Sequence, residues 1–150
     1  MQGKLSLFLF VAFVLAGGSL VGAFTVPGEW YAALEKPAFN PPPWLFFPMW
    51  SVLYVMIAVA GWRVWLIERD GPAVVAWWVQ LALNFIWPSA FFVARNLPLA
   101  LLIALVMLAV IVIFIVLAWR LARPAALLFL PYAAWVSFAV ALNASLVWLN

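Results

Sequence analysis

Long apolar runs separated by short polar breaks make up nearly the whole chain of 150 residues. The apolar runs cover residues 5–24, 44–67, 73–93, 99–119 and 125–148. About 20 apolar residues are enough for an α-helix to cross a bilayer. The pattern therefore predicts an all-α integral membrane protein, residues 1–150, that folds as a single bundle of five transmembrane helices.

The first run has a second interpretation, because Lys4 followed by apolar residues also suits a cleaved signal peptide. The run is as long as a membrane span, and it has no clear cleavage site with small residues at alternate positions. We therefore favour a spanning helix. Gly18 and Gly22, four residues apart in this run, would allow another helix to approach closely.

The break at residues 25–43 is the longest and the most unusual. It contains Glu35 beside Lys36 and a set of prolines, Pro37, Pro41, Pro42 and Pro43. Proline restricts the backbone without needing regular secondary structure. We predict a long structured loop between the first two membrane helices, which covers one end of the bundle as a lid.

Composition narrows the chemistry further. Hydrophobic residues make up 71% of the chain and charged residues 7%, against about 25% charged in soluble domains. The chain has no Cys and no His, which removes thiolate chemistry and the commonest general base and metal ligand. We expect no metal site and no obligatory cofactor. The net charge of +3 comes from few residues, so we relate it to membrane topology and expect the lipid bilayer, not nucleic acid, as a partner.

Basic residues also predict the orientation. Five helices put the two ends of the chain on opposite sides of the membrane. The N-terminal side has five basic residues and the side of the loop has two, Lys4, Arg63, Arg69, Arg120 and Arg123 against Lys36 and Arg95. The excess of positive charge predicts a cytoplasmic N-terminus.

Polar and aromatic residues fall on single faces of three of the predicted helices. Residues spaced three or four apart share a helical face, and this spacing joins Trp50 with Tyr54, Gln80 with Asn84 and Trp87, and Tyr132 with Trp135, Ala139 and Asn143. At a rise of ~1.5 Å per residue, Trp50 and Trp87 lie roughly 9 Å below the loop. The three faces would line one aromatic pocket beneath it.

Two other interpretations of these residues remain open. Trp and Tyr are common at membrane interfaces as anchors, which suits Trp30, Trp44 and Trp148 near the ends of runs. Asn84 and Asn143 could also bond to each other and hold two helices together.

Taken together, these residues resemble the tryptophan-rich sensory protein family, also called translocator protein or peripheral-type benzodiazepine receptor. The resemblance covers essentially the whole chain and rests on residues in matching order: Trp30-Tyr31, Leu34, Lys36-Pro37, Pro41-Pro42, Trp44, Pro48, Trp50, Leu53-Tyr54, Asn84, Trp87, Phe91-Phe92, Pro131-Tyr132, Trp135 and Leu142-Asn143. It implies a five-helix bundle that forms a homodimer. The short tails, and the absence of Tyr and of a basic residue from the sterol motif position at 143–150, resemble bacterial members.

The resemblance also implies a ligand and a site. Family members bind porphyrins, such as protoporphyrin IX and haem, and isoquinoline or benzodiazepine drugs, in a pocket under the first loop. Transferred by position, the lining residues would be Tyr31, Trp50, Asn84, Trp135 and Ala139, with Trp30, Phe91 and Asn143 nearby.

Three activities are consistent with such a site. The first is a tetrapyrrole-binding sensor or regulator, and the second is a translocator of porphyrin-type hydrophobic ligands. Ion-coupled transport is disfavoured, because no acidic residue lies inside an apolar run. The third is an enzyme that degrades porphyrins with light and oxygen, in which Trp50 and Trp135 would be the candidate catalytic residues. The chain lacks ordinary acid–base groups in its apolar runs, so such chemistry would depend on the ligand.

Overall fold

The structure, a computed structural model, describes residues 2–150, and every regular element within that range is helical. Five long helices and three short ones follow one another as α1 (Gln2–Phe24), α2 (Glu29–Ala33), the 3-10 turn η1 (Pro43–Leu45), α3 (Phe46–Ile67), α4 (Pro72–Pro88), the π-helical turn η2 (Ser89–Val93), α5 (Leu97–Leu121) and α6 (Arg123–Leu149). Five segments are long and apolar enough to cross a membrane, which agrees with the five predicted spans.

The bounds differ from the predicted ones for local reasons. Residues 43–45 form a 3-10 turn, so the α-helix predicted from residue 44 begins at Phe46. The α5 helix begins at Leu97, two residues earlier than predicted. The side chain of Asn96 accepts a hydrogen bond from the Leu99 N–H at 3.0 Å and so caps this end. Pro98 fits the first turn, where its missing N–H costs nothing.

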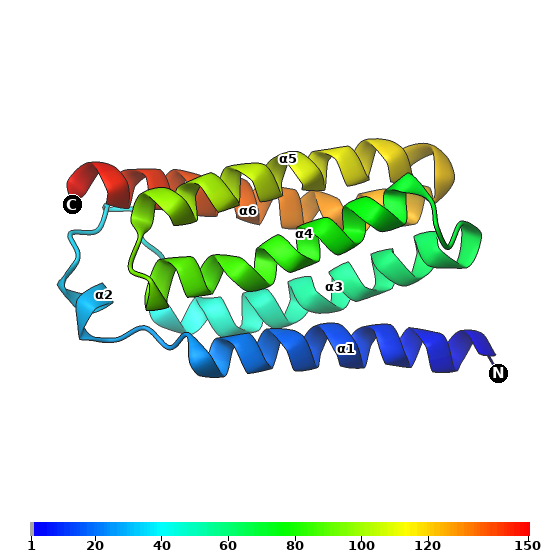
Figure 1. The fold of residues 1–150 in the computed structure, drawn as a ribbon, viewed down its shortest axis with the longest axis horizontal. Coiled ribbons are helices and arrows are strands. Elements are labelled where there is room, and N and C mark those ends of the chain that lie inside the picture. Colours follow the sequence, from blue (N-terminus) through cyan, green and yellow to red (C-terminus); the bar gives the residue numbers. More distant parts are fainter. Residues whose placement is uncertain (1) are drawn as a thin grey trace.

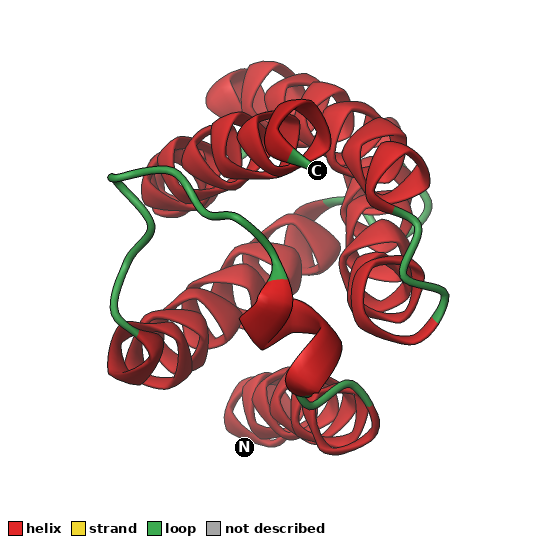
Figure 2. Ribbon diagram, turned by 90° about the vertical axis from the view of Figure 1, so that its left-hand side faces the viewer, coloured by secondary structure: helices red, strands yellow, loops and turns green. Residues whose placement is uncertain are grey.

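The long helices close into a ring. The contacts run from α1 to α3, from α3 to α6, from α6 to α5, from α5 to α4 and from α4 back to α1. The N-terminal end of α1 and the C-terminal end of α6 lie at opposite ends of the bundle (Figure 1). The segment 25–42 with the short helix α2 crosses the end where α6 finishes (Figure 2). This end is called the loop end below.

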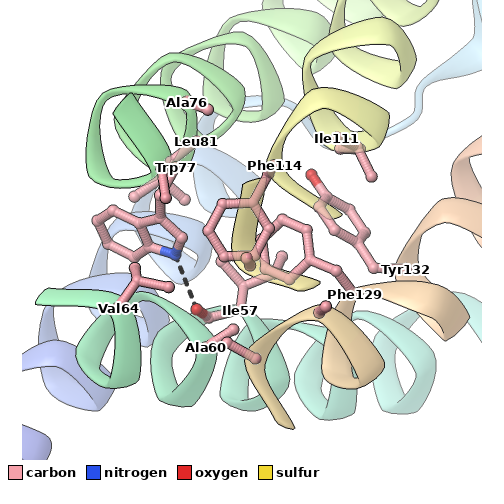
Figure 3. Packing of buried hydrophobic residues seen from close by; sticks show 14 of the residues in the cluster. Ile57, Ala60, Val64, Ala76, Trp77, Leu81, Ile111, Phe114, Phe129 and Tyr132 are labelled. Carbon is pink, nitrogen blue, oxygen red and sulfur yellow. Dashed lines mark hydrogen bonds between the residues drawn. The ribbon is translucent and has the colours of Figure 1, made fainter. Parts of the chain in front are cut away.

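Two apolar clusters fill the ring. The larger one joins the long helices (Figure 3), and within it the Trp77 N–H donates to the Ile57 carbonyl at 2.8 Å. The smaller one is called the loop-end cluster. It consists of Ala90, Phe91, Leu97, Ala100, Leu142 and Leu146, with Trp30, Tyr31, Leu34, Trp87, Phe92, Ile103, Phe138 and Val147 packed against it.

The glycines at which α1 packs closely against other helices are Gly17 and Gly18, and not the expected Gly18 and Gly22. A Cβ on Gly18 would collide with the Tyr54 ring, and one on Gly17 would come within 2.7 Å of the Phe85 ring. A Cβ on Gly22 would meet nothing within 4 Å. The prediction for Gly22 is therefore wrong, because no other helix comes close to α1 at this level, one turn beyond Gly18. The adjacent Gly17 and Gly18 accept one aromatic ring each from α4 and α3.

Pro88 ends the regular part of α4, as its position predicts. Proline has no N–H, so the hydrogen bond to the carbonyl four residues earlier, that of Asn84, is not made. The chain continues as a π-helical turn in which the Ala94 N–H bonds to the Ser89 carbonyl at 2.9 Å. Arg95 then adopts φ 53°, which turns the chain into α5.

Candidate functional site

A buried polar cluster joins three helices in the middle of the bundle. Tyr132 of α6 donates its hydroxyl proton to Gln80 Oε1 at 2.8 Å and accepts a hydrogen bond from Asn84 Nδ2 at 2.8 Å. Tyr54 of α3 donates to Asn84 Oδ1 at 3.0 Å. Gln80, Asn84 and Tyr132 are at most 3% exposed. Polar groups at membrane depth need such partners, because no water is available to replace them.

The bond between Asn84 and Asn143 that the sequence allowed can be checked against these contacts. The two side chains do not bond to each other. Asn84 bonds to the two tyrosines, while Asn143 Nδ2 donates to the Leu97 carbonyl at 3.1 Å. Each amide thus bonds to neighbouring helices, and the direct pair considered from the sequence is not formed.

Trp50 and Trp135 lie along the contact between α3 and α6. The Trp50 ring is 5.4 Å from the Tyr54 ring and 6.5 Å from the Tyr132 ring, between centroids. One turn nearer the loop end, the Phe46 and Trp135 rings are 6.1 Å apart, and Trp135 also contacts Phe138 at 5.5 Å. Since α3 and α6 are antiparallel, the two tryptophans lie about one turn apart on the same seam, with Trp50 directly beside the polar cluster.

The aromatic residues of the loop lie on the loop-end cluster. Tyr31 contacts the Phe91 ring at 6.0 Å and the Phe92 ring at 5.6 Å, and Trp30 contacts Phe91 at 6.1 Å. The guanidinium carbon of Arg95 lies 5.9 Å from the centre of the Trp30 ring, within the range of a cation–π contact. These contacts fix α2 to the turn between α4 and α5.

Two polar groups hold the rest of the loop. Lys36 Nζ donates to the carbonyls of Tyr31 at 2.7 Å, Leu34 at 3.0 Å and Ala32 at 3.3 Å. It thereby caps the C-terminal end of α2 instead of pairing with Glu35. Asn150 accepts from the Glu35 N–H and donates to the Glu35 carbonyl, both at 3.0 Å, which ties the loop to the end of α6. Burial raises the pKa of the Tyr31 hydroxyl, and the neighbouring Asn40 side chain opposes the rise.

The residues predicted to bind a ligand therefore form two neighbouring groups. Trp50, Asn84 and Trp135 lie at the contacts of α3 and α4 with α6, whereas Trp30, Tyr31 and Phe91 form the layer under the loop. Asn143 is 1% exposed and lies between the loop-end residues Leu142 and Leu146 on α6. Ala139 is half-buried, one turn from both Trp135 and Asn143.

The two best-defined hollows of the structure lie away from both of these groups. The structure has a shallow hollow of about 510 Å³ lined by Pro37, Ala144, Ser145, Trp148 and Leu149, and another of about 260 Å³ lined by Ile115, Val116, Trp119 and Arg120. Neither includes a predicted site residue. Asn84 is 3% exposed and lies beside the rings of Tyr54 and Tyr132, so a ligand that reaches it must separate side chains that are in contact here. Within the same range, no group of three His, Cys, Asp or Glu side chains could hold a metal ion.

Four residues of this region lie on the helical faces predicted to line the pocket but are not in the set of ligand-binding residues taken from the resemblance: Tyr54, Gln80, Trp87 and Tyr132. Their helical spacing put them on the correct faces, and that was the only available signal. Their bonding partners depend on how far each helix is shifted along its neighbours, which spacing within one helix does not determine.

Comparison with known proteins assigns the family. A profile of the TspO/MBR family matches residues 10–149. The chain belongs to the TspO/MBR family. It is 39% identical to the tryptophan-rich protein TspO of Chlorobaculum tepidum, over 97% of this chain and 96% of that protein. It is 35% identical to the tryptophan-rich sensory protein of Cereibacter sphaeroides, over 95% and 91% of the two chains.

Animal proteins match as well. The chain is 36% identical to the human translocator protein, over 84% of this chain and 79% of that protein. The family resemblance stated from the sequence is therefore confirmed. TspO/MBR membership together with five spans makes this chain an integral, multi-pass membrane protein.

Proposed function

We propose that this TspO/MBR protein binds a porphyrin-type tetrapyrrole, such as protoporphyrin IX or haem, and acts as a sensor or regulator, or as a translocator of such ligands. The observation that carries the proposal is the concentration of flat aromatic side chains and buried amides toward the loop end. Trp30, Tyr31, Phe91 and Phe92 form one layer there, and Trp50 lies beside Asn84 and the two tyrosines.

A large flat macrocycle matches this chemistry. Aromatic rings stack on its faces, and amide groups can meet its polar edge. The loop 25–43 would act as the lid that excludes water, since α2 is held by ring contacts and two polar anchors. Relatives carry the names tryptophan-rich sensory protein and translocator protein, and these names support the two roles.

Further properties belong to the same proposal. The site would also accept flat isoquinoline or benzodiazepine drugs, and two copies of the chain would form a homodimer in the bilayer. The N-terminus would be cytoplasmic and the loop would face away from the cytoplasm, because basic residues are more numerous at the opposite end. The proposed membrane is bacterial.

One arrangement favours a second function, the degradation of porphyrin by light and oxygen. Trp50 and Trp135 occupy the same seam between α3 and α6, so both could face one bound macrocycle. Trp50 also contacts the rings of Tyr54 and Tyr132, which are electron-rich neighbours.

A titration tests the proposal. Protoporphyrin IX added to the purified protein should quench tryptophan fluorescence and shift the porphyrin absorbance, and the affinity measured by absorbance should fall in the double variant Trp50→Phe/Trp135→Phe. Trp148→Phe is the matched control, because Trp148 is 89% exposed at the outer surface. Absence of binding to the unaltered protein would refute the function, and equal affinity in the double variant would refute the site. Illumination of the complex should change the porphyrin spectrum, compared with free porphyrin, only if the second function holds.

A further inference from the structure

We infer that the indole N–H of Trp87 is a hydrogen-bond donor to the bound ligand, and that the side-chain oxygen of Asn143 is the matching acceptor. The inference rests on the proposed function and specifies the chemistry of the same site. The ligand would be a flat apolar molecule that carries at least one hydrogen-bond acceptor and one donor.

Unpaired buried atoms are the starting observation. Within residues 2–150, four buried side-chain atoms have essentially no exposed surface and no hydrogen-bond partner: Asn40 Oδ1, Gln80 Nε2, Trp87 Nε1 and Asn143 Oδ1. Asn40 lies in the loop and Gln80 in the central polar cluster, so Trp87 and Asn143 are the two at the loop-end cluster. Native proteins pair nearly all such atoms, and each exception calls for an explanation. An unpaired polar atom is especially costly in a membrane protein, where water cannot reach it. A partner that appears in only one functional state explains why the cost is retained.

Both atoms belong to the same region of the bundle. Trp87 packs against the loop-end cluster, and its ring lies 4.9 Å from that of Phe91. Asn143 lies between two members of that cluster, Leu142 and Leu146. Its Nδ2 is already committed to the Leu97 carbonyl, which fixes the amide and leaves only the oxygen available. The pair thus offers one donor and one acceptor beside the loop-end cluster.

The backbone beside Trp87 can rearrange more readily than a regular helix. Pro88 follows it directly, and the π-helical turn Ser89–Val93 comes next. Proline removes one helical hydrogen bond, and π-helical turns are frequent at functional sites. A small shift in this segment moves Phe91 and Phe92, on which Trp30 and Tyr31 rest. Opening the loop and exposing the Trp87 N–H are therefore coupled through the same rings.

Trp77, also on α4, provides the contrast. It is 1% exposed, and its N–H donates to the Ile57 carbonyl at 2.8 Å. The partner is part of the fold, so this N–H stabilises the protein in every state. Replacing Trp87 by Phe should therefore mainly weaken ligand binding, whereas replacing Trp77 by Phe should mainly lower stability. This difference distinguishes a ligand contact from a structural one.

The experiment compares Trp87→Phe with Trp77→Phe in the full chain. Affinity for protoporphyrin IX is measured by porphyrin absorbance, and stability by the thermal unfolding midpoint without ligand. We expect Trp87→Phe to weaken binding about tenfold, as the loss of one hydrogen bond does. The thermal midpoint should fall only by the amount that the smaller volume of Phe causes. Trp77→Phe should lower the midpoint further and change the affinity little.

Replacing Trp87 by benzothienylalanine gives a second variant, since this residue keeps the bicyclic shape and lacks only the N–H. It should bind as weakly as Trp87→Phe while unfolding like the unaltered protein. Unchanged affinity in this variant, or a lowered midpoint, would overturn the inference. Failure of the unaltered protein to bind protoporphyrin IX would instead refute the proposed function, so the two failures are distinguishable.

Discussion

The hydroxyl of Tyr132 should contribute more to stability than any other single polar group in the bundle. Tyr132→Phe removes two hydrogen bonds of 2.8 Å at once. Gln80 then keeps no partner for either polar atom, because its Nε2 is already unpaired. At ~1–2 kcal/mol for each buried group left unpaired, the free energy of unfolding should fall by about 2–4 kcal/mol. Double-mutant measurements in membrane proteins favour the lower part of this range.

Tyr54→Phe is the matched control, because it removes the one bond to Asn84 Oδ1 and should cost about half as much. Unfolding in detergent, followed by circular dichroism as denaturing detergent is added, measures both losses. The double variant should cost less than the sum of the two, since both tyrosines bond to Asn84. The reasoning is refuted if Tyr132→Phe costs no more than Tyr54→Phe.

The other predictions use the glycines of α1, the end of α6 and the loop. Gly18→Ala should lower the free energy of unfolding by about 1–3 kcal/mol, because its Cβ collides with the Tyr54 ring, whereas Gly22→Ala should have little effect; equal losses would contradict the packing of α1. Asn150→Ala should speed amide hydrogen exchange in the segment 25–42 and leave that of α5 unchanged, and unchanged exchange in the loop would show that the pair with Glu35 does not hold it. Since the chain has no Cys, Phe39→Cys should react with an impermeant maleimide only from outside the cytoplasm and Asp70→Cys only from inside; the reverse result would overturn the proposed orientation.

The five helices follow from the sequence because length and apolarity alone determine a membrane span. The end of α4 follows as well, since Pro88 must interrupt the helix wherever the chain folds. The π-helical form of the next turn was not predictable. It depends on how residues 89–93 settle against α5 after the Asn84 carbonyl has lost its helical partner.

The sequence does not determine which polar groups form hydrogen bonds between helices. Spacing placed Asn84 and Asn143 on faces that point inward, and this was correct. Whether each amide meets the other, a tyrosine or a carbonyl depends on shifts of a few ångströms along the helix axes. The same shifts place Gly18, and not Gly22, against an aromatic ring. The partners of Lys36 in the loop could not be predicted either, because the three carbonyls that it bonds come together only after α2 has formed.

The buried tryptophan N–H groups of the two clusters differ in their pairing, and this difference bears on function. In the larger cluster, the Trp77 N–H and the Tyr132 hydroxyl both have partners on other helices. In the loop-end cluster, Trp87 Nε1 and Asn143 Oδ1 have none among the described residues. A fold selected only for stability would pair these atoms or replace them with apolar groups. Gln80 Nε2 is unpaired as well, but the other polar atom of that side chain is held by Tyr132. Trp87 Nε1 and Asn143 Oδ1 lie where α2 rests on aromatic rings, so the part of the bundle best suited to receive a ligand is also a part where few hydrogen bonds are lost when it opens.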